Sequence, residues 1–342
     1  MKLDKILPLF LLLVITFFTA NSQERNRVMF YNVENLFDPF NDTLTNDDEF
    51  TPEGTRFWSW KRMTDKLNKI SKVVTAVGEW DPPVVVGFCE VENGLVMNQL
   101  ISETPLAKFG YKLVHRESPD RRGIDVALIY RPDRFELEEE HFFQVVNPDE
   151  PSRTTREVLY ARGIVAGIDT VHFFVNHWPS KFGGALASEP GRLAAGKLVR
   201  QKVDSIRIFE PEARIVIMGD FNDIPSSAAI TEALGAVPVS ENFEIDKLYN
   251  LHHKYDGSST GSLKYQGQWE TIDMMIVSGG LLSRNHNLYV NPDGGMIYSN
   301  EFLLEQDEGF VGVRPFRTYI GFKYHGGFSD HLPIYIDLLP TK

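Results

Sequence analysis

The sequence predicts an α/β fold in one domain, and two kinds of pattern support this. Short, uninterrupted apolar runs recur along the chain, as in strands buried on both faces, and 215–218 is the clearest of them. Between these runs lie segments with the spacing of amphipathic helices, such as Met63, Leu67, Ile70, Val74 and Val77. No repeat, linker or composition break follows residue 26, so one compact domain is the simplest interpretation.

The composition is that of a globular protein with an acidic balance. Of 342 residues, 42% are apolar and 24% are charged, and the formal net charge is −12 at pH 7. This charge argues weakly against non-specific clamping of long nucleic acid, but it does not exclude a phosphoester substrate, because a bound metal ion reverses the local field. The single cysteine, Cys89, excludes an intramolecular disulfide, and its apolar surroundings predict a buried thiol rather than a nucleophile.

Residues 1–22 have the pattern of a secretory signal peptide. Two lysines precede an apolar run over 6–18, which is too short to span a bilayer, and small polar residues follow it. Cleavage there is expected to leave 23–342 as a single mature domain that is secreted or periplasmic, with no stable membrane span. An uncleaved membrane anchor is the alternative.

Apolar runs bounded by turn residues predict the strands. They are expected, in order, over 27–33, 84–89, 123–131, 160–168, 171–175, 215–218, 271–278 and 332–338. The strands over 160–168 and 171–175 are expected to form a hairpin that turns at Asp169 and Thr170.

Helical spacing and capping residues predict the helices. They are expected over 63–77, over 94–101, from Ser188 as the N-cap to Ile206, and near 226–234. The segments 38–60 and 279–327 lack a clear period and are interpreted as long surface loops. His252 and His253 have no motif around them and are expected at the surface.

The run over 215–218 ends in the sequence GDFND, which contains Asp220, Asn222 and Asp223. Ligands of open α/β folds bind beyond the carboxyl ends of strands, where loops are free to carry polar groups. On its own, the motif is equally consistent with residues that cap the turn and the next helix.

Polar residues mark the ends of several other strands, and caps alone do not explain so many of them. These residues are Asn32, Glu90, His177, Asp330 and His331, and Asp273 lies within an otherwise apolar strand. Carboxylates and amides without a cysteine cluster suit a hard cation such as Mg²⁺, Mn²⁺ or Ca²⁺. Such an ion beside imidazoles is suited to activating water against a phosphoester.

These motifs resemble the endonuclease/exonuclease/phosphatase superfamily. The stretches YNVEN, CEVEN, NHWPS, GDFND, TIDMMIVS and SDH follow its order over nearly the whole mature chain, and NHWPS resembles the deoxyribonuclease-like branch with two catalytic histidines. The resemblance implies a four-layered α/β sandwich, in which two mixed β-sheets pack face to face with helices outside. It places the active site at one edge of that sandwich.

The resemblance also implies roles for the residues that handle metal and water. Glu90 would bind the divalent ion, and Asn32 and Asp330 would contribute directly or through water. Asp220 would orient or deprotonate the attacking water, and Asn222 would donate its amide hydrogen to a phosphoryl oxygen.

The imidazoles take the remaining roles implied by the resemblance. Asp273 would fix the tautomer of His331, which would stabilise the phosphoryl group or transfer a proton there. His177 would protonate the leaving oxygen. Candidate substrate-binding residues are Asn176, Ser180 and Lys181, although a solvated lysine is the alternative at position 181.

The sequence leaves open the positions of three further acidic side chains relative to the site. Glu34 and Glu92 are expected either to be solvated or to support the residues that contact the substrate without contacting it themselves. For Asp125, contact with the site and a position away from it are equally consistent with the sequence. Aromatic residues of the long loops either stack on a base or sugar, insert into lipid, or form a small local core. They are Trp58, Trp60, Phe302, Phe310, Phe316 and Tyr319.

The leading functional hypothesis is a metal-dependent phosphoesterase, most of all a phosphodiesterase or nuclease that uses metal-assisted attack by water. A phospholipid or sugar-phosphate phosphodiesterase is the alternative within that class, and a catalytically inactive binding module is the alternative outside it. The sequence has neither the GNH[DE] element of calcineurin-like phosphoesterases nor the G-x-S-x-G element of serine hydrolases. The sequence does not predict an oligomeric state.

Overall fold

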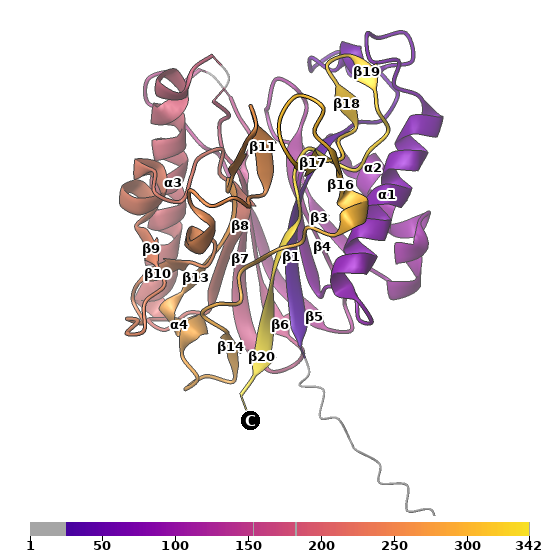
Figure 1. The fold of residues 1–342 in the computed structure, drawn as a ribbon. Coiled ribbons are helices and arrows are strands. Elements are labelled where there is room, and N and C mark those ends of the chain that lie inside the picture. The colour runs from indigo at the N-terminus through magenta and orange to yellow at the C-terminus, as the bar shows by residue number, and fades with distance from the viewer. Residues whose placement is uncertain (1–24, 153, 182, 342) are drawn as a thin grey trace, which may run out of the picture.

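Two β-sheets pack face to face, and helices cover the outer face of each, in the computed structural model (Figure 1). The structure describes residues 25–152, 154–181 and 183–341. The predicted four-layered α/β sandwich is therefore confirmed, whereas the predicted signal peptide over 1–22 lies outside the described residues. Within the described ranges, no helix is both long enough and apolar enough to cross a membrane.

The first sheet is mixed and has seven strands in the described part of the chain. Its order is β14 (Leu288–Val290), β20 (Ile334–Pro340), β1 (Asn26–Leu36), β2 (Val85–Val91), β4 (Asp125–Tyr130) and β3 (Lys112–His115), and β15 (Met296–Ile297) pairs with β20. Strands β1 and β2 run parallel, with Asn32 in register with Cys89. Asn32 and Glu90 therefore lie at the same end of this sheet.

The second sheet is also mixed, and seven of its strands are described. Its order is β5 (Phe135–Phe143), β6 (Val158–Val165), β7 (Asp169–His177), β8 (Ile215–Asp220), β13 (Asp273–Ser278), β10 (Leu248–Asn250) and β9 (Ala236–Pro238). Strand β8 is parallel to β7 and antiparallel to β13. The end of β7, the end of β8 and the beginning of β13 consequently lie side by side.

Helices and short hairpins complete the fold. The helical elements are α1 (Trp60–Gly78), α2 (Gly94–Ser102), α3 (Ala185–Phe209), α4 (Gly279–Leu282), η1 (Asp48–Phe50), η2 (Pro105–Phe109), η3 (Ala229–Leu234), η4 (His253–Tyr255) and η5 (Glu301–Leu303). The hairpins pair β11 (Leu263–Tyr265) with β12 (Gln268–Glu270), β16 (Leu304–Gln306) with β17 (Val313–Pro315), and β18 (Tyr319–Ile320) with β19 (Lys323–Tyr324).

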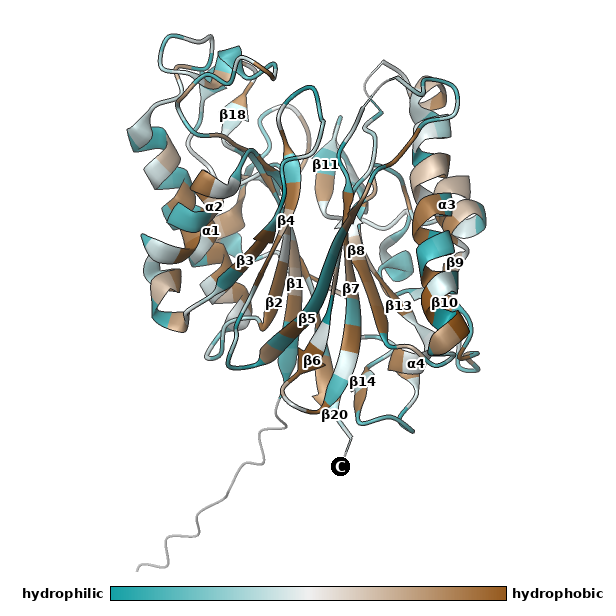
Figure 2. Cartoon of the chain, turned by 180° about the vertical axis from the view of Figure 1, so that it is seen from behind, coloured by the Kyte–Doolittle hydropathy of each residue, from teal (hydrophilic) through white to brown (hydrophobic). Residues whose placement is uncertain are grey.

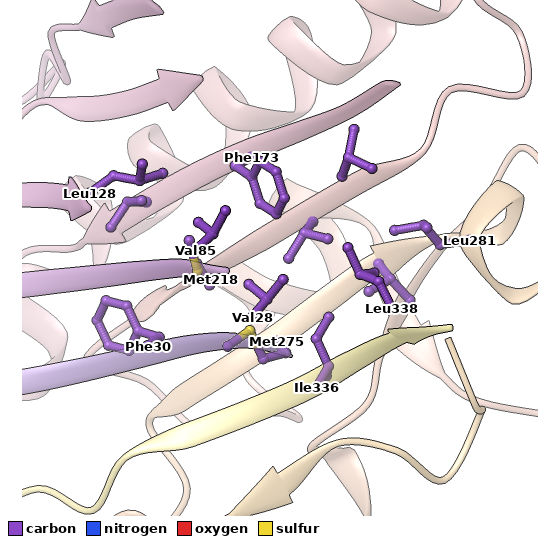
Figure 3. Packing of buried hydrophobic residues seen from close by; sticks show 14 of the residues in the cluster. Val28, Phe30, Val85, Leu128, Phe173, Met218, Met275, Leu281, Ile336 and Leu338 are labelled. Atoms are coloured by element: carbon purple, nitrogen blue, oxygen red, sulfur yellow. The ribbon is translucent and has the colours of Figure 1, made fainter. Parts of the chain in front are cut away.

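Alternation of side chains along the strands creates the layers. On β1, Val28 and Phe30 face the other sheet, whereas Met29 and Tyr31 pack with α1 and α2. Figure 3 shows Val28, Phe30 and Met218 in the interface between the sheets. The central strands are hydrophobic over most of their length because both of their faces are buried (Figure 2).

Most of the predicted element boundaries differ from the structure by a few residues, and two of these differences have a clear local cause. The hairpin turns over 166–168, because Ala166 and Gly167 adopt positive φ angles of 52° and 68°, so Asp169 already begins β7. Helix α3 begins at Ala185, and Ser188 is therefore not its N-cap; the Ser188 hydroxyl donates to the Gly184 carbonyl within the first turn.

The two segments interpreted as loops contribute to the core. Phe50 and Trp58 are buried, and the rings of both pack against Tyr319. Segment 279–327 carries α4 and the short strands β14 to β19. Several of the loop aromatics thus form a local core.

The expectation that His252 lies at the surface is wrong. Its side chain is buried, and its Nδ1 accepts a hydrogen bond of 3.2 Å from the backbone N–H of Met275. Burial lowers the pKa of His252 to about 4, so this neutral imidazole is a structural hydrogen-bonding group.

Candidate active site

Three polar residues lie in register at one end of three central strands of the second sheet. His177 and Asp273, which lie on β7 and β13, are both in register with Asp220 on β8. All three are buried, and Nε2 of His177 lies 3.8 Å from Oδ2 of Asp220. A Cβ atom at Gly219 would lie 2.4 Å from the carbonyl oxygen of Asn176, so the close approach of β7 and β8 here requires glycine.

The first sheet contributes Asn32, whose amide joins the two sheets. Its Nδ2 donates to Oδ2 of Asp220 at 3.0 Å and lies 3.4 Å from Oε1 of Glu90. The other carboxylate oxygen of Glu90 accepts a hydrogen bond of 2.9 Å from the backbone N–H of Asn35. Both strands are irregular here, with positive φ angles of 58° at Asn35 and 61° at Glu90, and this irregularity lets their polar groups converge.

His331 is held in a fixed orientation by Asp273. Its Nδ1 lies 2.7 Å from Oδ2 of Asp273, while its Nε2 lies 3.9 Å from Oδ2 of Asp220 and 4.0 Å from Oδ1 of Asp330. The Ser329 hydroxyl accepts a hydrogen bond from the His331 backbone N–H and donates one to the Asn32 carbonyl. The imidazole therefore presents Nε2 to the space between the two sheets.

Burial and neighbouring charges give the titratable groups different proton affinities. Burial raises the pKa of Asp220 to about 7, and the Asp273 charge adds to this effect. Burial alone would lower the pKa of His331, but Asp273 and Asp220 outweigh it and hold this pKa well above its ordinary value. The pKa of His177 is well below its ordinary value because of burial and the charges of Arg156 and Arg122. At neutral pH one imidazole is cationic and the other is neutral.

Asn222 and Asn176 flank Trp178. The Asn222 backbone N–H donates to Oδ1 of Asp220 at 2.8 Å, and its side-chain Nδ2 donates to the Trp178 carbonyl at 3.0 Å. The Asn176 amide donates to the Met218 carbonyl and accepts from the Trp178 indole N–H. Asn176 is buried, and its amide is used within the protein.

The other two candidate substrate-binding residues lie at the surface. Ser180 is exposed. The ammonium of Lys181 lies 3.6 Å from Oε2 of Glu270 and 3.8 Å from Oδ1 of Asp223, and its side chain is 36% exposed. Lys181 is thus placed between two acids at the rim and is partly open to solvent.

The sequence did not identify Arg317 as part of this region. Its Nη2 donates to Oδ2 of Asp330 at 2.9 Å, and its Nε lies 3.5 Å from Oε1 of Glu34. Glu34 is buried rather than solvated, and it also accepts a hydrogen bond of 2.6 Å from the Thr318 backbone N–H. The charge of Lys66 also acts on Glu34, and burial lowers the pKa of this lysine to about 8. Arg317 lies in 279–327, where no motif marked it, so no sequence signal could have found it.

Asp125 and Glu92 have other partners. Oδ2 of Asp125 lies 3.1 Å from Nε2 of His115, and Oδ1 accepts the Ser118 backbone N–H. Glu92 is buried rather than solvated, and it accepts the Asp38 backbone N–H at 2.6 Å. Burial raises the pKa of Glu92 to about 9.

Buried aspartate and histidine groups that could bind a metal ion are present at this site. Among the described residues, two sets have ligand atoms within 4.8 Å of one another, namely Cys89, His177 and Asp220, and Asp220, Asp273 and His331. Burial raises the pKa of the Cys89 thiol, which makes the first set a poor match for a hard ion.

In the second set, Asp273 and His331 are bonded to each other, but the buried Oδ1 of Asp273 has no hydrogen-bond partner among the described residues. Glu90 adds carboxylate oxygens at the same place, beside Asp220, whereas Asn32 presents its amide Nδ2 there and its Oδ1 accepts the Glu34 backbone N–H at 2.9 Å. This oxygen-rich donor set fits a hard divalent cation.

The contact between Asp273 and His331 generates a prediction about protonation. Replacing Asp273 by Asn removes the charge that most strongly favours the imidazolium, so we expect the pKa of His331 to fall by at least about one unit. An NMR titration of the imidazole in metal-free protein measures this shift. The account is wrong if the pKa of His331 is the same in Asp273→Asn and in the wild type.

Comparisons with known proteins agree with this geometry. A family model described as "Endonuclease/Exonuclease/phosphatase family" matches residues 27–339. No curated protein sequence matches the chain.

Similar solved structures include an endonuclease/exonuclease/phosphatase family protein from Bacteroides thetaiotaomicron, which is 17% identical, with 93% of this chain and 98% of that chain covered and a TM-score of 0.55. A mannosyl-6-phosphatase of the same organism is 17% identical over 92% of this chain and 99% of its own, also with a TM-score of 0.55. Truncated TDP2 from Caenorhabditis elegans has the same identity and TM-score, over 92% of this chain and 97% of that chain.

At such identities the structural likeness concerns the fold, while the family model covers nearly the whole described chain. The sandwich fold and its buried acidic and histidine groups are those of a phosphoesterase, a hydrolase. The chain belongs to the endonuclease/exonuclease/phosphatase family.

Proposed function

We propose that this protein is a divalent-metal-dependent phosphodiesterase that attacks its substrate with an activated water molecule. The observation that carries this proposal is the chain of contacts from Asn32 through Asp220 to His331 and Asp273, which joins both sheets in a buried site. A phosphodiester has no leaving group that departs easily, so its hydrolysis needs both an activated water and a stabilised phosphoryl group.

Asp220 is the group that would orient or deprotonate the water. The Asn222 backbone N–H fixes one of its oxygens, and Asn32 fixes the other. Burial raises its pKa to about 7, which makes this carboxylate a stronger base near neutral pH than an exposed aspartate. The Asn222 side chain would reach a phosphoryl oxygen only by releasing the Trp178 carbonyl, to which it now donates.

The two imidazoles divide the remaining work. A cationic His331, with Nδ1 held by Asp273, would direct Nε2–H at a phosphoryl oxygen and stabilise its developing negative charge. His177 is neutral in the free protein, so it would protonate the leaving oxygen only after the anionic phosphate has raised its pKa.

Glu90, with Asn32 and Asp330, would hold the metal ion. A divalent ion bound there supplies positive charge to the phosphoryl oxygens and polarises the phosphorus. Glu90 keeps a weakly engaged oxygen, Oε1, for this purpose, whereas Asp330 shares its carboxylate with Arg317. Magnesium, manganese and calcium all match these donors.

Nucleic acid is the leading candidate substrate, which would make the protein a nuclease. We also propose that the protein is exported, because residues 1–22 have the pattern of a signal peptide. A phospholipid diester is the second candidate, because Phe310 and Val311 are 52% and 96% exposed in the turn between β16 and β17. The Lys264 ammonium donates to the Val311 carbonyl, and Leu263, its neighbour on β11, forms a β-bridge with His331. This places an apolar turn near the catalytic histidine, where a lipid surface would bring its headgroup.

A substrate panel tests the reaction. The mature protein from residue 23 is expected to hydrolyse bis-p-nitrophenyl phosphate and plasmid DNA with Mg²⁺ or Mn²⁺, and to lose this activity when a chelator removes the metal ion. The panel also contains RNA, a sphingomyelin-type lipid and a phosphomonoester. Hydrolysis of the lipid without the nucleic acids would favour the second candidate, and activity that survives thorough chelation would exclude the metal mechanism.

Single substitutions test the residue roles. We expect Asp220→Asn and His331→Ala each to reduce kcat by about 10²–10⁴-fold, because each removes a proton-transfer or charge-stabilising group. Circular dichroism should show the wild-type fold in both variants. Near wild-type turnover by either one would refute its assigned role.

A further inference from the structure

A cavity of about 590 Å³ opens beside the site and is lined by Arg121, Arg122 and Arg156. Its wall also includes Pro179 and Ser180, which follow the end of β7 closely in the chain. This gathering of cations contrasts with the net charge of −12 for the chain. Electrostatic attraction at the cavity therefore favours an anion even though the whole protein repels anions.

The acids of the cavity wall do not cancel these cations. Glu49 pairs with Arg56, which is outside the wall, at 3.0 Å. Asp120 lies 3.1 Å from the Arg156 guanidinium, and its negative charge offsets the positive charge of that group alone. Arg121 and Arg122 remain as exposed cations beside the cavity.

Arg156 connects the cavity with the proposed catalytic residues. Its Nη2 donates to the Trp178 carbonyl at 2.9 Å, and the same carbonyl accepts the Asn222 side chain at 3.0 Å. Arg156 is only 8% exposed, and its Nε is buried without a hydrogen-bond partner among the described residues. A buried donor of a charged group without a partner is costly, so this guanidinium keeps a demand for negative charge that an anion in the cavity would help to meet.

Arg122 makes the corresponding connection on the other sheet. Its Nη2 donates to Oδ1 of Asn35, whose backbone N–H donates to Oε2 of Glu90. Arg122 and Arg156 are also close enough to His177 for their charges to lower its pKa, after the larger effect of burial. Both guanidinium groups thus lie near the position of the scissile phosphate in the proposed reaction.

We propose that this arginine-lined cavity binds a second phosphate of the substrate, next to the phosphodiester that is cleaved. The inference rests on the proposed phosphodiesterase function and deepens it. Guanidinium groups bind phosphate oxygens through paired N–H donors, so two or three of them suit a phosphate better than a carbohydrate or an acyl chain. The second phosphate belongs either to the adjoining nucleotide of a nucleic acid or to a phosphorylated sugar diester.

The test compares matched substrates that differ in one phosphate. The first pair is a dinucleotide with and without a terminal phosphate, and the second is a sugar methyl phosphodiester with and without a separate phosphate monoester. We expect the extra phosphate to raise kcat/KM of the wild type about tenfold or more in at least one pair. The pair that responds identifies the source of the phosphate.

Two variants locate this preference in the cavity. Arg122→Gln and Arg121→Gln should each move the ratio of kcat/KM values toward one, whatever their absolute activity. Arg284→Gln is the matched control, because Arg284 is exposed and stacks on Tyr289 beside α4, outside the cavity wall. It should keep the wild-type ratio.

The outcomes separate this inference from the proposed function. If the wild type hydrolyses the substrates without the extra phosphate and shows no preference in either pair, the second-phosphate site is wrong and the phosphodiesterase assignment stands. A preference that persists in both Arg122→Gln and Arg121→Gln also overturns the assignment of the cavity. If no diester is hydrolysed with any metal ion, the proposed function fails and the inference falls with it.

Discussion

The hydrogen bond between Asn32 and Asp220 is the contact on which the site depends, because it joins the ends of two separate sheets. Each sheet brings part of the chemistry: the first brings the carboxylate of Glu90 and the bridging amide of Asn32, and the second brings His177, Asp220 and Asp273. Packing of the apolar inner faces fixes the distance between the sheets. The precision of the polar edge therefore derives from the hydrophobic interface beneath it.

Burial makes the site reactive because it shifts the pKa values of the polar groups at these strand ends. Removing charged groups from water raises the pKa of Asp220 and lowers that of His177, while Asp273 keeps His331 protonated. Groups whose proton affinities are driven apart in this way can serve as base and acid at one pH. The same crowding of acids creates a demand for positive charge, which a divalent cation would meet.

Uninterrupted apolar runs predicted the central strands, because such runs leave few alternatives to burial on both faces, and the resemblance of the motifs to a known family implied the sandwich. Strands β3 and β5 were missed because they lack such a run. The sequence placed polar residues at strand ends correctly, but it could not show that His177, Asp220 and Asp273 lie in register, since register depends on pairing between distant segments. Arg317, Arg122 and Arg156 were missed for the same reason: each acts through contacts far along the chain, and no local motif marks it. His252 was misplaced because its burial is set by tertiary packing alone.

The most direct test of the account is a double-mutant cycle between the two sheets. Asn32→Ala, Asp220→Asn and the double variant are compared by kcat on bis-p-nitrophenyl phosphate, at a saturating metal concentration, after each has been shown to fold. If the contact between the two side chains makes one catalytic unit, the double variant will be little slower than the slower single variant. Losses that simply multiply would contradict the account, because they would mean that the two residues act independently.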